Sequence, residues 1–181
     1  KGGDRGRVSF SMSDELAFAW NLLEAKELTQ EEYSSVVQDL TEMSSVDSAT
    51  TVSVLHVLEG RAFKNLEKAM AFVSKECGAP LISIACFDLR PEATSLLSPE
   101  FMLKRGALVF EVLGKDALAV VMNPYDRQLR KEIEGMAGRK CHFFMTLPSE
   151  FDKALEAVTK GGAGQAPADE KKEKPKDKKG K

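Results

Sequence analysis

The sequence predicts an α+β protein in which tandem helical hairpins precede a small mixed α/β sheet domain. Before Pro80, apolar residues recur at spacings of three and four, the period of an amphipathic helix. After Pro80, short apolar runs alternate with helix starts, a pattern typical of a sheet covered by helices. The chain has 181 residues, 43% of them hydrophobic, which is enough for one ordinary domain or two small ones.

Two helix–turn–helix units are expected before Pro80. The first helix starts at Ser13 and the second at Thr29, where Glu32 completes a capping box. The segment 23–28 aligns with 58–63 at an offset of 35, and the following apolar stripe aligns at an offset of 33. The second turn should therefore be two residues shorter than the first.

The β-branched segment 51–58 is ambiguous between helix and strand, and the repeat favours helix. Gly78 is predicted to end the last helix of the second unit in a left-handed cap, because Pro80 prevents continuation.

The second part is predicted to have the order β-α-α-β-β-α-β-α. Its elements are a strand at 81–87, short helices starting at Arg90-Pro91 and Ser98-Pro99, strands at 107–113 and 117–122 joined by a Gly114-Lys115-Asp116 turn, a helix from Asn123-Pro124-Tyr125-Asp126 to about Met136, a strand at 140–145 and a last helix from Pro148.

Charge is distributed unevenly along the chain. The net charge is −2, but residues 161–181 carry seven Lys against four acids, which leaves about −5 for residues 1–160. This tail has no aromatic or β-branched residue, so we expect it to be disordered. It is either a solvated tail or an electrostatic tether to an acidic partner, a membrane surface or nucleic acid. The predicted divisions are a flexible N-terminus (1–12), a helical subdomain (13–79), an α/β subdomain (80–160) and a disordered basic tail (161–181).

Four segments carry a family resemblance. They are Cys77-Gly78-Ala79-Pro80-Leu81-Ile82, Leu96-Leu97-Ser98-Pro99-Glu100, Leu118 to Asp126 with its Met-Asn-Pro-Tyr-Asp turn, and Gly138-Arg139-Lys140 before a strand. In this order they resemble the N-terminal domain of type II secretion and type IV pilus assembly ATPases, over about residues 13–160. The resemblance implies a domain that docks to the cytoplasmic side of the secretion or pilus machine.

One branch of that family binds cyclic di-GMP through two tandem helix–turn–helix motifs, each opening with Arg-Leu-Gly. Here the first opening falls on Ala17-Phe18-Ala19, and a later Gly of the motif falls on Lys26. In the second unit Val52-Ser53-Val54 stands at the opening and Arg61 at the Gly. These departures remove a cation that would pair with phosphate and glycines that allow close backbone approach. If the nucleotide binds, the resemblance places it at Phe18, Leu22, Leu23 and Leu28.

Catalytic and metal motifs were sought in the sequence. The chain contains no phosphate-loop motif, and its three Cys lack paired C-x-x-C spacing, so we expect reduced core cysteines, no metal and no cofactor. His56 is interpreted as a hydrogen-bonded or half-exposed histidine rather than a ligand. No signal peptide or membrane span is visible, which predicts a cytoplasmic protein. No catalytic constellation is legible in the sequence, so we expect a non-enzymatic protein.

The candidate partner-binding residues are Trp20, Tyr125, Arg127 and Arg130. For the two aromatic residues, core packing is the alternative to an interface role. Arg127, Arg130 and Lys131, with Lys104 and Arg105, form either a basic patch or a solvated helix face interleaved with acids. The leading hypothesis is an interaction module that binds a component of a secretion, pilus or motility machine. The alternative is a cyclic-di-GMP sensor.

Overall fold

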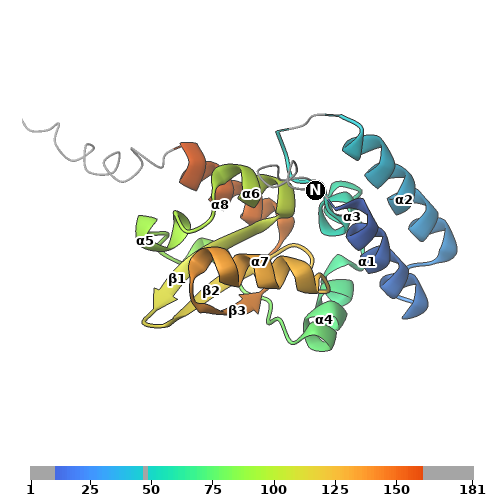
Figure 1. Ribbon diagram of the computed structural model, residues 1–181. Coiled ribbons are helices and arrows are strands. Elements are labelled where there is room, and N and C mark those ends of the chain that lie inside the picture. The colour runs from blue at the N-terminus through green and yellow to red at the C-terminus, as the bar shows by residue number, and fades with distance from the viewer. Residues whose placement is uncertain (1–10, 47–48, 161–181) are drawn as a thin grey trace, which may run out of the picture.

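The computed structural model describes residues 11–46 and 49–160. Its helical half, on one side of the molecule in Figure 1, comprises α1 (Met12–Glu24), α2 (Gln30–Ser44), α3 (Val54–Gly60) and α4 (Leu66–Cys77). The segment 51–58, ambiguous in the sequence, therefore enters a helix. The predicted flexible N-terminus, up to residue 10, and the predicted disordered tail lie outside the described residues.

Two of the predicted helix ends are confirmed. Thr29 accepts the Glu32 backbone N–H at 3.1 Å, and the Glu32 carboxylate accepts the Thr29 N–H at 2.8 Å, which completes the capping box. Gly78 ends α4 with φ 66°. The predicted start at Ser13 is wrong by two residues: Ser11 stands at the N-cap of α1, and its hydroxyl bonds the Asp14 carboxylate.

The two helical turns have the same length, so the predicted shorter second turn is wrong. The helix before the turn ends at Glu24 in the first unit and at Gly60 in the second. The helix after the turn starts at Gln30 and at Leu66, so both boundaries recur 36 residues apart. In each turn one residue other than glycine adopts a left-handed conformation, Lys26 at φ 64° and Ala62 at φ 53°. The sequence alignment at an offset of 35 matched apolar side chains. The length of the turn depends instead on the backbone conformation of these two residues.

The second half contains the 3₁₀ turn η2 (Ile84–Cys86), α5 (Pro91–Thr94), α6 (Pro99–Arg105), β1 (Ala107–Leu113), β2 (Asp116–Val121), α7 (Arg127–Ala137), β3 (Lys140–Phe144) and α8 (Pro148–Lys160). The strands lie in the order β1-β2-β3, antiparallel between the first two and parallel between the last two. This confirms the predicted α+β class with a mixed sheet.

The predicted strand at 81–87 does not form as such. Only Leu81 pairs, in a single parallel bridge with Met145, before the chain enters η2. Side chains accept the backbone N–H groups that a neighbouring strand would otherwise bind: Ile84 N–H donates to the Thr146 hydroxyl at 3.3 Å, and Ala85 N–H donates to the Glu150 carboxylate at 3.4 Å.

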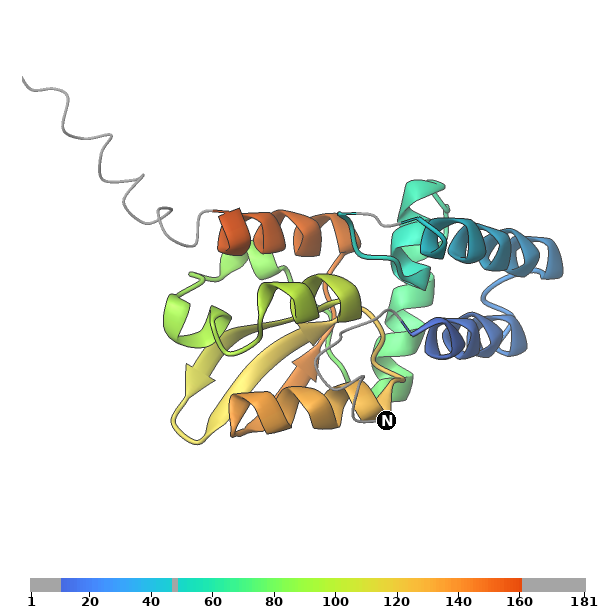
Figure 2. The same cartoon turned by 45° about the horizontal axis from the view of Figure 1, so that its top comes forward.

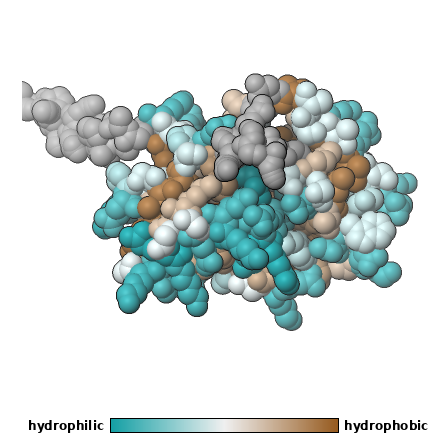
Figure 3. All heavy atoms as spheres, viewed as in Figure 1, coloured by the Kyte–Doolittle hydropathy of each residue, from teal (hydrophilic) through white to brown (hydrophobic). Residues whose placement is uncertain are grey.

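Helices cover both faces of the sheet. Figure 2 shows α6 and α8 on one side of it and α7 on the other. Hydrophilic residues gather over α7 in the face drawn in Figure 3, in keeping with a helix that buries only Leu129, Ile133 and Ala137.

Buried side chains form two clusters, one within the α/β half and one within the helical half. Met145, Tyr125 and Leu147 come from the α/β part of the sequence but pack in the helical cluster. The two halves therefore share packing, and their division into subdomains stays a prediction.

Candidate functional site

The turn 123–126, between β2 and α7, joins the two halves of the molecule. Asn123 is 2% exposed, and its amide donates to the Asp14 carbonyl at 3.1 Å and to the Glu15 carboxylate at 3.0 Å. Asp126 accepts the Leu129 N–H at 2.9 Å, which caps α7. One short turn thus fixes both the first helix and the helix that follows the sheet.

Glu15 is the buried acid of this junction. Its carboxylate accepts the Val54 N–H of α3 at 2.8 Å in addition to the Asn123 amide. Burial raises the pKa of Glu15 to about 7, and the negative charge of Asp126 acts in the same direction. The Glu15 carboxyl group therefore connects α1, α3 and the turn at a buried position where its ionised form is unfavourable.

Tyr125, predicted to bind a partner, makes contacts within the molecule. Its ring lies 5.2 Å from that of Phe18, and its hydroxyl donates to Glu76 of α4. Burial and the bond to Glu76 raise the pKa of the tyrosine hydroxyl. The structure uses this side chain to hold α1 and α4 against the turn.

Two of the candidate cations are also engaged internally. Arg105 bonds Asp126 at 3.1 Å and Glu132 at 2.7 Å, with only 13% of its side chain exposed. Arg130 donates to the Pro124 carbonyl at 2.8 Å, and its guanidinium lies 4.9 Å from the Phe143 ring centroid. Arg127, in contrast, is exposed.

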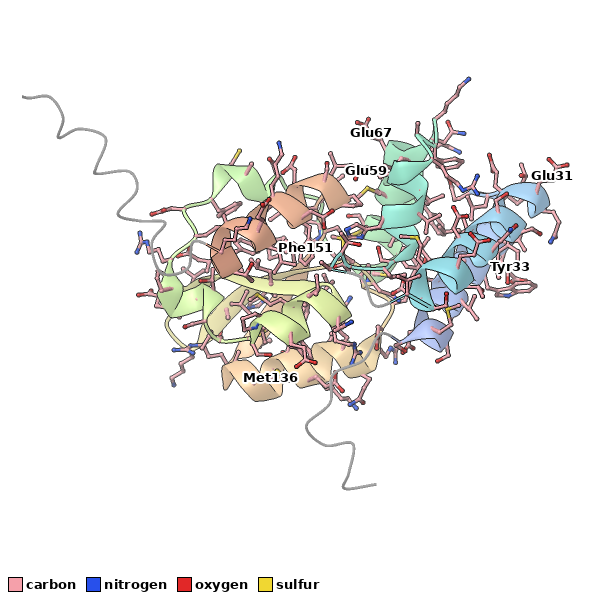
Figure 4. All side chains as sticks on the ribbon, turned by 90° about the horizontal axis from the view of Figure 1, so that it is seen from above. Glu31, Tyr33, Glu59, Glu67, Met136 and Phe151 are labelled. Atoms are coloured by element: carbon pink, nitrogen blue, oxygen red, sulfur yellow. The ribbon has the colours of Figure 1, made fainter. Side chains whose placement is uncertain are left out.

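The residues proposed for a nucleotide lie together on and just after α1, mostly in the core. Phe18, Leu22 and Leu28 are buried, and Leu23 is half-buried. Trp20 differs from them: it is 48% exposed, and the edge of its ring meets Tyr33 of α2 with 5.8 Å between centroids. Figure 4 shows Tyr33 at the outer side of the helical half.

Sequence reasoning missed a Ser–His–Asp arrangement. Nδ1 of His56 lies 2.7 Å from the Ser53 hydroxyl, and Nε2 lies 2.8 Å from the Asp152 carboxylate, 96 residues away. Ser53 is 1% exposed and accepts the His56 N–H as the cap of α3, so its role is structural. Only the packing of α3 on α8, with Phe151 buried beneath the imidazole, creates the pair.

Cysteines and metal ligands are dispersed among the described residues. Cys141 is buried and Cys77 half-buried, and burial raises the pKa of each thiol to about 11. Cys86 is exposed, so its predicted core position is wrong. Within 11–46 and 49–160, no three His, Cys, Asp or Glu side chains gather as a metal site, and no helix is long and apolar enough to cross a membrane.

Comparison with known proteins gives a family match for the second half of the chain. Residues 77–165 match the MshEN domain family. This confirms the resemblance to the N-terminal domain of secretion and pilus assembly ATPases drawn from the sequence. No curated protein matches the chain.

One solved structure shows a similar fold. A structure of MshE with cdg shares 14% identity over 77% of this chain and 96% of that chain, with a TM-score of 0.51. The N-terminal domain of XpsE, in two crystal forms, shares 18% and 21% identity, covers 81% and 78% of this chain and 94% of each of those chains, and has TM-scores of 0.46 and 0.45.

Proposed function

We propose that this chain, whose residues 77–165 belong to the MshEN domain family, is a non-catalytic docking module. Its partner is a protein component of a secretion, pilus or motility machine, bound on the cytoplasmic side. The MshEN match is the observation that carries the proposal. Binding rather than chemistry is supported by the internal engagement of Glu15, His56, Arg105 and Arg130.

The proposed partner surface is the outer face of α1 and α2. Trp20 is the candidate anchor, because a half-exposed indole resting on Tyr33 has the size and rigidity common at binding hot spots. Arg127 is exposed on α7, so it can still meet a partner. Tyr125 and Arg130 support the surface from inside through the turn 123–126.

The test is affinity capture from lysate of the source organism, with the full chain as bait and mass spectrometry as readout. We expect a component of such a machine to be recovered, and Trp20→Ala to reduce its recovery about tenfold or more, as at a hot spot. Leu113→Ala is the matched control, because Leu113 is an equally exposed apolar residue on the β1–β2 hairpin. Equal recovery by the two variants would remove Trp20 from the surface, and failure to recover any machine component would contradict the function.

Cyclic di-GMP is the second candidate ligand. Two observations favour it: the turns within the two helical hairpins recur 36 residues apart, and the fold is similar to that of MshE, which was solved with cdg. The sequence opposes it, because the positions of the Arg-Leu-Gly openings hold Ala17-Phe18-Ala19 and Val52-Ser53-Val54.

Calorimetric titration of the full chain with cyclic di-GMP separates the two candidates. A docking module without nucleotide control gives no heat of binding and no shift of the thermal midpoint. Saturable binding that is lost in Leu23→Asp, whose half-buried side chain lies on α1, would instead establish the sensor function.

A further inference from the structure

A groove of about 630 Å³ follows one face of α8, between this helix, α6 and the segment just before α3. Figure 2 shows α6 and α8 side by side, with that segment near the start of α8. Pro99, Leu103 and Leu155 give the groove an apolar floor. Neither Trp20 nor the turn 123–126 contributes to it, so it is distinct from the proposed docking surface.

Carboxylates surround this apolar floor. Glu100, Asp152 and Glu156 line the groove, and Lys160 is its only cationic lining residue among those described. The Glu156 carboxylate and the Lys160 ammonium group lie 2.9 Å apart in an exposed ion pair, and such pairs contribute little free energy in water. Asp152 bonds His56, and Glu100 has no ion pair within the described residues. The groove therefore presents an excess of negative charge to any occupant.

The chain itself supplies a cationic segment at one end of the groove. Lys160 is a lining residue, and the 21 residues that follow it carry seven lysines against four acids. We propose that residues 161–181 bind back across this groove, with lysine ammonium groups against Glu100, Asp152 and Glu156. The long lysine stems cover Leu103 and Leu155 while their charged ends reach the carboxylates.

The covalent geometry permits this return. The run Gly161-Gly162-Ala163-Gly164 allows the chain to reverse direction directly after α8. The face of α8 from Asp152 to Lys160 is about 12 Å long at ~1.5 Å per residue. An extended segment from Gly164 to Lys172 spans about 26 Å at ~3.3 Å per residue, so the first tail lysines reach the far end of the groove.

Attachment also compensates for weak individual contacts. A segment tethered at the edge of its binding site has an effective concentration of about a millimolar. A single surface lysine–carboxylate pair contributes little to the binding free energy, but several act together here. Because the tail is part of the same chain, binding does not carry the entropy cost of bringing two molecules together. The contact should be sensitive to salt, because its charges face solvent.

Limited trypsin digestion of the full chain tests the proposal, with mass spectrometry following cleavage after Lys171, Lys172 and Lys178. In low salt, the double variant Glu100→Gln/Glu156→Gln is expected to lose its tail about threefold faster or more than the unmodified chain. High salt, at ~0.5 M NaCl, should bring the unmodified chain to the rate of the variant.

The matched control neutralises two acids elsewhere, Glu31→Gln/Glu67→Gln, which Figure 4 places in the helical half. It should cleave at the rate of the unmodified chain. Equal tail cleavage in all three proteins overturns the proposal, and so does protection that disappears on dilution, since that would place the tail in the groove of a second copy.

Nuclear magnetic resonance gives a readout that does not depend on the protease. Replacement of Lys171, Lys172 and Lys174 by Ser in the full chain should move the amide resonances of Leu155 and Thr159, which line the groove. Unchanged resonances at both positions would contradict a bound tail.

Discussion

At the scale of single residues, Glu15 and Trp20 differ in burial from what the sequence favours: the acid is buried and the indole is half-exposed. The acid looks like a first-turn helix residue, yet it is buried between α1, α3 and Asn123. The indole belongs to an apolar stripe, yet nearly half of it is exposed. The burial of Glu15 is not visible in the local sequence, because its hydrogen-bond partners lie 39 and 108 residues away.

The raised pKa of Glu15 predicts a pH-dependent stability. Its pKa is about 7 in the folded protein against 4.5 when solvated, so the folded state holds this proton more tightly between those values. The contribution of Glu15 to the free energy of unfolding is therefore fully present below about pH 4.5 and falls as the pH rises through 7. The total loss is on the order of 3 kcal/mol.

Urea unfolding of the unmodified chain and Glu15→Gln, measured from pH 5 to pH 8, checks this. The glutamine does not ionise, so the stability of the variant relative to the unmodified chain should rise with pH. Glu24→Gln, at an exposed position at the end of the same helix, should follow the unmodified chain throughout. Parallel curves for all three proteins would show that Glu15 does not titrate with folding.

At the scale of elements, the two helical hairpins share one turn geometry despite different side chains. Helices of 13 and seven residues end with the same hydrogen bonds, Glu27 N–H to Leu22 carbonyl and Phe63 N–H to Leu58 carbonyl. Both require a left-handed residue, and the chain places Lys26 and Ala62 there. A side chain in this conformation costs about 1–2 kcal/mol relative to glycine.

Glycine at these positions should therefore stabilise the protein. Lys26→Gly and Ala62→Gly are each expected to raise the free energy of unfolding by about 0.5–1 kcal/mol, because relief of strain exceeds the added entropy of the unfolded chain. Ala25→Gly is the control: Ala25 has φ −83°, so glycine there should give no gain. Chemical denaturation measures all three, and equal effects at 25 and 26 would contradict the strain.

At the scale of the whole molecule, two clusters of buried side chains are joined by bonds that cross between them. Glu15 bonds Asn123, Tyr125 bonds Glu76, and His56 bonds Asp152. Met145, the residue directly after β3, is fully buried and packs in the helical cluster. Neither half can unfold without exposing partners of the other.

We expect a single cooperative unfolding transition. Trp20 is the one tryptophan and reports on the helical half, whereas far-ultraviolet circular dichroism reports on both halves. The two signals should change at the same urea concentration, and Asn123→Ala should shift both by the same amount. Fluorescence that changes before the dichroism would mean that the helical half unfolds alone.

The sequence by itself determined the helices, most of their ends and the three strands, because these depend on local periodicity, capping residues and turn glycines. It also indicated the family resemblance, through the ordered motifs between Cys77 and Lys140, and residues 77–165 match the MshEN domain family. It overextended the strand at 81–87, since Leu-Ile-Ser-Ile has the composition of a strand whether or not a neighbour pairs with it.

Only the tertiary structure decided what the polar residues do. Nothing near them in the sequence fixes the partners of Arg105, Arg130, Tyr125 and His56. Packing gives each a partner from a distant segment: Asp126, the Cys77 carbonyl, Glu76 and Asp152, respectively. Burial makes this necessary, because a polar group removed from water must find a hydrogen bond within the protein. The same packing leaves Trp20 exposed and brings α6 and α8 together to form the acidic groove, neither of which is fixed by residues adjacent in the chain.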